Sequence, residues 1–266
     1  MFLSTVVKYI SLTWEMTKLS ILSAMEYRVS FFVQVFGMFV NDIAFIVMWL
    51  IFFQKFPSIN GWQFQDTVML FALTTVNFAI VMIFARGAFE LSRTIARGEL
   101  DYYLSFPKNV LWHVLVSKTE ISAIGDLLFG LIIFFFSGNI SLEKIGLFVV
   151  IGILTALIFL NFIIITQSIT FYVGNFEEAA EQMFHALLGF MLYPQTAFYG
   201  ALKIVMLTII PAFFIATLPV QLIQKFNPQL FLILIGFWIF TTIIATVIFK
   251  CGLRRYESGN LINVKM

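Results

Sequence analysis

The stretch Arg93-Thr-Ile-Ala-Arg-Gly-Glu-Leu-Asp-Tyr-Tyr-Leu-Ser-Phe-Pro107 is a polar island in a chain that is otherwise mostly apolar. A long apolar run ends just before it, at Ala85, and another begins at about Leu111. Gly98 is well placed to end the incoming helix, because glycine readily adopts the left-handed backbone conformation in which helices end. The island therefore predicts a short polar connection outside the membrane, between two membrane-crossing helices.

A short helix is expected in the second half of this island. Glu99 and Asp101 would lie in its first turn, where the partial positive charge of a helix favours acidic side chains. Leu100, Leu104 and Pro107 are spaced i, i+4 and i+7, which predicts that they share one face. Pro107 stands where such a helix should stop. We expect a two-faced helix that lies across the membrane surface and either transmits force or docks a partner.

Composition places the chain in the membrane. Of its 266 residues, 61% are hydrophobic and 11% are charged, and its mean hydropathy is +0.99. Soluble domains carry about 25% charged residues, so this chain has too few polar groups to cover a surface in water. The net charge of +2 gives no argument for a nucleic-acid partner. With Cys251 as its lone cysteine, the chain has no internal disulfide.

We therefore expect an all-α membrane protein made of one transmembrane domain over residues 1–266. An amphipathic helix at 1–25 is expected to lie in the membrane interface, where it carries a specific role or simply packs under the membrane part. The apolar runs predict six transmembrane helices, and the last is followed by a tail at 251–266. The predicted crossings cover residues 29–54, 67–92, 112–136, 145–174, 180–195 and 229–250.

The distribution of basic residues predicts the orientation. With six crossings and both ends of the chain in the cytoplasm, 12 of the 16 Lys and Arg residues lie inside. Only Lys55, Lys144, Lys203 and Lys225 then lie outside, as the positive-inside rule requires. A seventh crossing would place the basic tail outside, so we expect an even number.

Prolines argue against a crossing between residues 196 and 224. Pro194, Pro211 and Pro219 interrupt this apolar region, and each costs roughly 3 kcal/mol in the interior of a plain helix. Non-helical backbone survives at membrane depth only where protein or a cavity shields it. We expect a pair of short helices that enter the membrane from the outer side and return to it.

Signatures of catalysis are missing from the sequence. It has no GxxxxGK[ST] phosphate loop, no HExxH and no Gly-x-Ser-x-Gly motif. His113 and His185 lie far apart in the chain, and a structural role is expected for each. We expect that the chain is not an enzyme.

Three parts of the sequence carry a resemblance to a known family. They are the island Gly98-Glu-Leu-Asp101…Leu104…Pro107, the proline-broken region Tyr193-Pro194…Tyr199…Ile210-Pro211…Leu218-Pro219, and the closing Gly252-Leu-Arg-Arg-Tyr-Glu-Ser258. Over nearly its whole length the chain resembles the type-2 ATP-binding-cassette (ABC) export permeases, in the small six-helix subfamily that includes viologen and antibiotic exporters.

The resemblance implies partners and parts. Two permease chains, identical or homologous, would form the membrane core of an exporter in the inner (cytoplasmic) membrane, above two ATPase subunits. Those subunits would bind ATP and Mg, so no cofactor is expected in this chain. The implied exporter moves a hydrophobic or amphiphilic substrate outward by ATP-driven alternating access.

Specific residues of this chain match the family's parts. The coupling helix at 93–107, which contacts the ATPase in such permeases, corresponds to Arg97, Gly98, Glu99, Leu100, Asp101, Tyr103, Leu104 and Pro107. The implied outer gate corresponds to Pro194, Tyr199, Pro211 and Pro219. The cytoplasmic tail is marked by Arg254, Arg255, Tyr256 and Glu257.

Polar residues within the predicted crossings are candidates for the substrate path, because such residues are costly in a membrane. They are Asn41, Asp42, Asn77, Asp126, Asn161 and Gln167. For Asn77, Asn161 and Gln167, hydrogen bonds between helices are the favoured explanation. Asp42 lies well inside the first crossing, where a carboxylate in a cleft between two permeases would suit a cationic substrate.

Other functions stay open on the sequence. In a secondary transporter or channel without an ATPase, Asp42, Glu120 and Asp126 would relay protons. An intramembrane enzyme acting on lipids would need a cluster of His, Asp or Glu at one membrane depth, which the two histidines do not supply. A structural partner of another permease is the remaining alternative.

Overall fold

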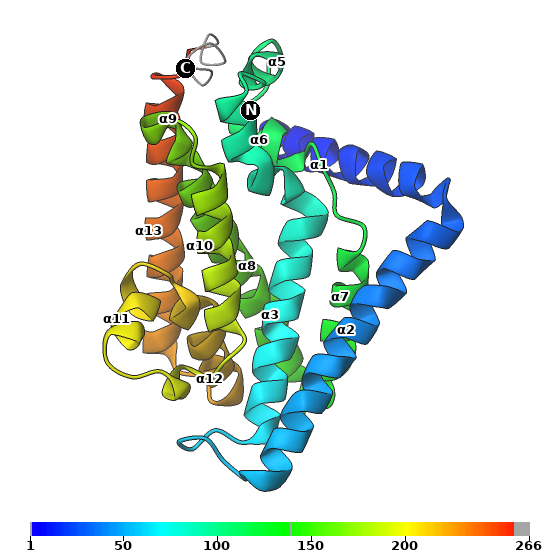
Figure 1. Ribbon diagram of the computed structural model, residues 1–266, viewed down its shortest axis with the longest axis vertical. Coiled ribbons are helices and arrows are strands. Elements are labelled where there is room, and N and C mark those ends of the chain that lie inside the picture. Colours follow the sequence, from blue (N-terminus) through cyan, green and yellow to red (C-terminus); the bar gives the residue numbers. More distant parts are fainter. Residues whose placement is uncertain (1, 139, 258–266) are drawn as a thin grey trace.

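The structure is a computed structural model that describes residues 2–138 and 140–257. The described chain is helical, as predicted (Figure 1). Both of its ends lie at the same end of the helix bundle, beside α5 and α6 (Figure 1), and we call this the basic end. The predicted tail at 251–266 lies outside the described residues from residue 258 onward. The elements are α1 (Phe2–Met25), α2 (Arg28–Lys55), α3 (Phe64–Ala85), η1 (Arg86–Glu90), α4 (Leu91–Ala96), α5 (Leu100–Leu104), α6 (Val110–Val116), α7 (Ala123–Phe134), α8 (Leu142–Ser168), α9 (Thr170–Val173), α10 (Glu177–Met191), η2 (Gln195–Ala197), α11 (Ala201–Thr208), η3 (Phe213–Thr217), α12 (Leu218–Gln224) and α13 (Pro228–Leu253).

The first two helices stand at the edge of the fold. α1 lies crosswise at the basic end, and α2 runs from it along the outside of the bundle (Figure 1). In α2 only Asp42, Trp49 and Phe53 are buried, while apolar side chains such as Phe32 and Phe36 are exposed. Because α2 is apolar on every side, its exposed faces are suited to lipid or to another protein rather than to water.

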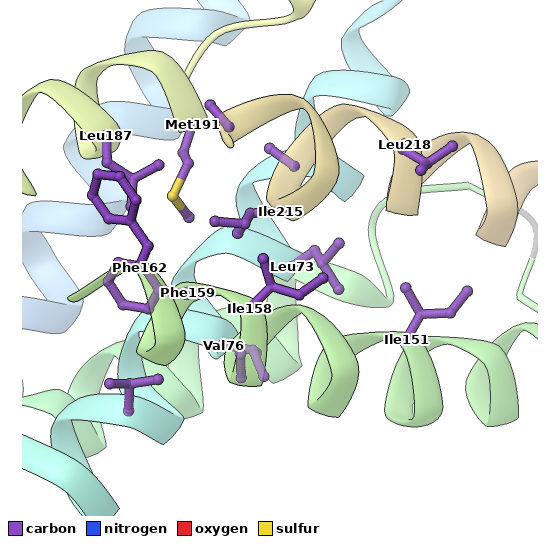
Figure 2. Close-up of a cluster of buried hydrophobic side chains, with 14 of the residues drawn as sticks. Leu73, Val76, Ile151, Ile158, Phe159, Phe162, Leu187, Met191, Ile215 and Leu218 are labelled. Atoms are coloured by element: carbon purple, nitrogen blue, oxygen red, sulfur yellow. The ribbon is translucent and has the colours of Figure 1, made fainter. Parts of the chain in front are cut away.

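The core of the bundle is built from helices that are far apart in the sequence. Figure 2 shows Leu73 and Val76 of α3 facing Ile158 and Phe159 of α8, with Met191 of α10 closing the cluster. Glycine allows a close contact between α7 and α3, because a Cβ at Gly130 of α7 would lie 2.7 Å from Cγ2 of Val76. α3 and α8 are consequently the buried centre of the molecule.

The predicted third crossing, 112–136, is not one helix. α6 and α7 are separated by a break at Ser117–Ser122. Ser117 Oγ donates a hydrogen bond to the carbonyl oxygen of Val114 (2.7 Å), and serine side chains that bond to the backbone in this way compete with regular helix. The Glu120 amide donates to the Met82 carbonyl oxygen of α3 (2.9 Å), so the break is held by the neighbouring helix.

The proline-rich region forms two short helices, and their entry into a membrane from the outer side stays a prediction. α11 and the helix that follows it, residues 213–224, are bent by 69° around Pro211. Pro219 does not break the structure. It lies in the first turn of α12, after the π-helical turn η3, where a missing amide proton is tolerated.

Within residues 2–138 and 140–257, four helices are long and apolar enough to cross a membrane: Arg28–Lys55, Phe64–Ala96, Leu142–Val173 and Pro228–Leu253. The bent pair of short helices would make a fifth if it counted as one crossing. The four long helices correspond to the predicted crossings 29–54, 67–92, 145–174 and 229–250. α10 is shorter than a crossing and ends at Met191 rather than at residue 195, because the approach to Pro194 leaves the helical conformation. The chain is thus a multi-pass membrane protein, and the count of six stays a prediction.

Candidate functional site

The polar island begins with a well-formed helix end. α4 ends at Ala96, and Gly98 has a φ of +74°, as its predicted role requires. The Gly98 amide donates to the Ile95 carbonyl oxygen (3.2 Å), and the Glu99 amide donates to that of Thr94 (3.0 Å). This pair of bonds is a Schellman motif, in which the left-handed residue redirects the chain. It sets the direction in which α5 leaves the bundle.

α5 is anchored mainly through Leu100, with Tyr103 packed beside it. Leu100 is fully buried in a cluster with Leu91, Ile95, Val114 and Phe249. The shared face predicted for Leu100, Leu104 and Pro107 is wrong, because α5 ends at Leu104 and that side chain is 45% exposed. Ser105 Oγ bonds back to the Tyr102 carbonyl oxygen (2.7 Å), and the chain turns before it reaches Pro107.

The outer side of α5 presents an exposed apolar tip, which we define as Tyr102, Leu104 and Phe106. These side chains are 63%, 45% and 39% exposed, and the Tyr102 and Phe106 rings pack edge to face at 5.0 Å. Tyr103 is half-buried, with its ring 5.1 Å from that of His113. The remaining predicted coupling residues that are exposed lie around the tip: Arg97, Glu99, Asp101 and Pro107. A rigidly held apolar tip is a surface suited to docking.

The C-terminal tail packs against this same region. Tyr256 contacts the cluster around Leu100, and burial beside the Asp101 carboxylate raises the pKa of Tyr256 to about 12. The Arg255 guanidinium lies over the Tyr172 ring at 5.0 Å. Arg254 and Glu257 are exposed. The tail therefore connects α13 to the polar island, which the sequence did not predict.

Two carboxylates meet inside the bundle. Asp42 of α2 and Asp126 of α7 are 7% and 2% exposed, and their side chains are neighbours in the interior of the bundle. One oxygen of each has no hydrogen-bond partner among the described residues. Both line a cavity of about 200 Å³, the carboxylate pocket. Its other walls are Met38, Asn41, Phe45, Phe71, Thr74, Thr75, Phe78, Leu188, Met191 and Leu192.

The structure separates the other candidate polar residues from this pocket. Asn161 donates to Thr241 Oγ1 (3.2 Å) and Thr242 Oγ1 (2.9 Å), which ties α8 to α13. Gln167 Oε1 accepts from the Ser92 amide at 2.9 Å. Asn77 reaches the Ile215 carbonyl oxygen at 3.5 Å. These amides hold helices together, whereas Asn41, Asp42 and Asp126 share one cavity.

A network of charged side chains lies at the break of the third crossing, and the sequence predicted only one of its ion pairs. Arg86 pairs with Glu90 at 3.9 Å, as their i, i+4 spacing predicts. Arg86 Nε also lies 3.5 Å from Glu120, and Lys118 pairs with Glu90. The break at Ser117–Ser122 brings Lys118 and Glu120 close to η1. Because the break is not helical, the spacing of its residues in the sequence does not predict these contacts. The network links η1 to that break.

The opposite end of the bundle holds the predicted gate residues. Asn60 Nδ2 donates to the Thr196 carbonyl oxygen (2.8 Å) and to the Tyr199 hydroxyl, so the loop after α2 is tied to the segment after Pro194. Tyr199 is 70% exposed. Pro211 lies at the bend between the short helices, and Pro219 lies buried in α12.

Comparison with models of protein families shows to which family the chain belongs. The family model described as ABC-2 family transporter protein matches residues 39–259, most of the chain. The chain belongs to the ABC-2 transporter family. Comparisons with curated proteins and with solved structures gave no match.

The matched region of this ABC-2 transporter contains the island, all residues of the carboxylate pocket except Met38, and the tail up to Tyr256 and Glu257. The resemblance found in the sequence is thus confirmed at the level of type-2 ABC permeases. An ABC-2 permease is a membrane transport component and is not itself catalytic.

Proposed function

We propose that this chain is the permease subunit of an ABC exporter, and that the apolar tip of residues 102–106 docks onto a separate ATPase. The supporting observation is the asymmetry of α5. Leu100 is fixed in the bundle, while Tyr102 and Leu104 point away from it and are exposed. An element held so firmly at one side transmits displacement of its docked partner to α4 and α6.

The proposed cycle follows from these connections. ATP closes the ATPase pair, the docked tips approach each other, and the bundles of two permeases tilt. The mostly exposed α2 is the face on which a second permease, identical or homologous, would pack. The basic end would face the cytoplasm, in accord with the distribution of Lys and Arg. The exporter would then lie in the inner membrane.

The carboxylate pocket is the proposed substrate path of this exporter. Asp42 and Asp126 place two carboxyl groups in this cavity, which carry negative charge when they are ionised, and the rings of Phe45, Phe71 and Phe78 supply an apolar wall. Such a pocket suits an amphiphilic substrate with a positive charge, because carboxylates and aromatic faces both attract cations.

The docking proposal is tested with the double variant Tyr102→Ala, Leu104→Ala. We expect the ATPase partner to lose affinity for the permease by roughly 30-fold or more, as for the loss of interface hot spots. The matched control is Phe136→Ala, Leu142→Ala, which removes two side chains that are 69% and 86% exposed on the other side of the third crossing. Unchanged ATPase binding and unchanged stimulation of ATP hydrolysis in the first variant would refute the proposal.

A second candidate function, proton-driven transport without an ATPase, rests on the proximity of Asp42 and Asp126. Glu120, the third member of the relay considered from the sequence, instead lies beside Arg86. Transport by the purified chain in vesicles that lack any ATPase would establish this alternative. Transport that requires ATP and the partner would exclude it.

A further inference from the structure

A cavity with lysines in its wall opens where α1, α6 and α13 meet at the basic end. It has a volume of about 540 Å³, within the range of roughly 300–1,000 Å³ that is typical of ligand pockets. Lys108 precedes α6, Lys250 belongs to the last turn of α13, and Tyr9 belongs to α1. We call this cavity the lysine pocket.

The charge of the lysine pocket is uncompensated. No Asp or Glu is among the residues that line it. Within residues 2–138 and 140–257, neither Lys108 nor Lys250 forms an ion pair. Because the two ammonium groups come from different elements and flank one cavity, the pocket complements a negatively charged group.

Neutral hydrogen-bonding groups complete its polar wall. The Asn109 amide donates to the Tyr9 hydroxyl at 3.2 Å, and Asn109 Oδ1 caps α6 by accepting from the Trp112 amide at 3.1 Å. The Tyr9 ring packs against the Trp112 ring, with 5.9 Å between centroids. Tyr and Trp prefer the depth of lipid headgroups, since each has an apolar body and a polar tip.

An apolar crevice adjoins the lysine pocket. This second cavity, of about 160 Å³, shares Trp112 and Leu115 with the first. It is lined by apolar side chains of α3 and α8, such as Phe84 and Leu157, with Thr13 of α1 above it. A pocket lined by two lysines that adjoins an apolar crevice matches a molecule with an anionic head and a hydrocarbon tail.

We propose that the lysine pocket and the crevice together bind an anionic phospholipid, with the phosphate between Lys108 and Lys250 and an acyl chain along Trp112. Basic pockets between membrane helices bind anionic headgroups in this way. A free phosphate would use only the first cavity, which is why the crevice assigns the ligand to a lipid. This site is separate from the carboxylate pocket and from the docking tip, and it does not depend on the function proposed for either.

Native mass spectrometry of the purified, delipidated full-length chain tests the site. The probes are dioleoyl phosphatidylglycerol, dioleoyl phosphatidylcholine with the same chains, and soluble glycerol phosphate. We expect phosphatidylglycerol to bind roughly 10- to 30-fold more tightly than phosphatidylcholine, from two lysines near the headgroup. Glycerol phosphate should bind far more weakly than either lipid.

The variant Lys108→Gln, Lys250→Gln should bring the two lipids to equal affinity. Its matched control is Lys203→Gln, Lys225→Gln, which removes two exposed lysines from the segment between α10 and α13 and should keep the preference. Equal binding of both lipids by the unaltered chain would overturn the proposal, and this comparison needs no variant. Equal loss in the control pair, or glycerol phosphate binding as tightly as phosphatidylglycerol, would also overturn it.

Discussion

Gly125→Ala is expected to force α2 away from the bundle. A Cβ at Gly125 of α7 would lie 2.2 Å from the Val35 carbonyl oxygen and 3.3 Å from the Met38 Cβ, both on α2. Carbon and carbonyl oxygen ordinarily approach to about 3.3–3.6 Å. The two helices must therefore separate by about 1 Å, because the obstructing oxygen belongs to the backbone and has no rotamer to adopt.

The loss of stability caused by Gly125→Ala depends on how α2 is attached to the bundle. With only Asp42, Trp49 and Phe53 buried on α2, this contact is one of few that attach the helix. Overpacking of this kind costs about 1–3 kcal/mol. At about 2–4 °C per kcal/mol, the melting temperature should fall on the order of 2–12 °C.

Two other glycines give matched controls for the same substitution. Gly37 of α2 and Gly236 of α13 have nothing within 4 Å of the position a Cβ would occupy. Alanine there should raise stability slightly, by about 0.4–1 kcal/mol, because it restricts the unfolded chain. Thermal unfolding of the purified variants, followed by circular dichroism, compares all three. If the melting temperature of Gly125→Ala equals that of Gly236→Ala and is no lower than that of the unaltered chain, the close approach of α2 and α7 is refuted.

Three further outcomes follow from the site. Asp42→Asn and Asp126→Asn should each reduce transport of a cationic amphiphile by roughly 10-fold or more, as the loss of a charge-assisted contact implies. The assay measures transport in vesicles that also contain the partner ATPase, and unchanged transport would show that the pocket is not used. Gly98→Ala should destabilise the chain by about 1–2 kcal/mol because of its positive φ, whereas Gly98→Asn should cost less, and equal melting of the two would contradict this. The pKa of Tyr256 is raised, so its packing near Asp101 is fully stabilising below about pH 10, the ordinary pKa of tyrosine, and this stabilisation is lost as pH rises through about 12. The melting temperature of the unaltered chain should therefore decline between those pH values, and Tyr256→Phe should abolish this decline. An unchanged pH profile in the variant would count against the contact.

Periodicity and composition were enough to predict the long helices. Residues 29–54 and 229–250 appear as α2 and α13, because an uninterrupted apolar run has few alternatives to a helix in a membrane. The role of Gly98 was equally predictable from the sequence, since it is local and glycine tolerates positive φ. Such features are decided within a few residues.

Contacts between distant segments were not predictable in the same way. Nothing in the sequence pairs Asp42 with Asp126, or places Tyr256 against the cluster around Leu100. The exposure of Leu104 was also missed, because an i, i+4 pattern assumes a helix longer than the five residues of α5. Tertiary packing decided each of these outcomes.

The interruption of the third crossing at Ser117–Ser122 means that this crossing is jointed rather than rod-like. α6 follows the apolar tip in the chain, while α7 carries Asp126 and packs against α3. We expect a stroke delivered to α6 to be absorbed as altered angles at the joint, and to reach the membrane interior mainly along α3. The charges of Arg86, Glu90 and Lys118 that brace the joint are partly open to solvent, so its stiffness should soften as salt is added.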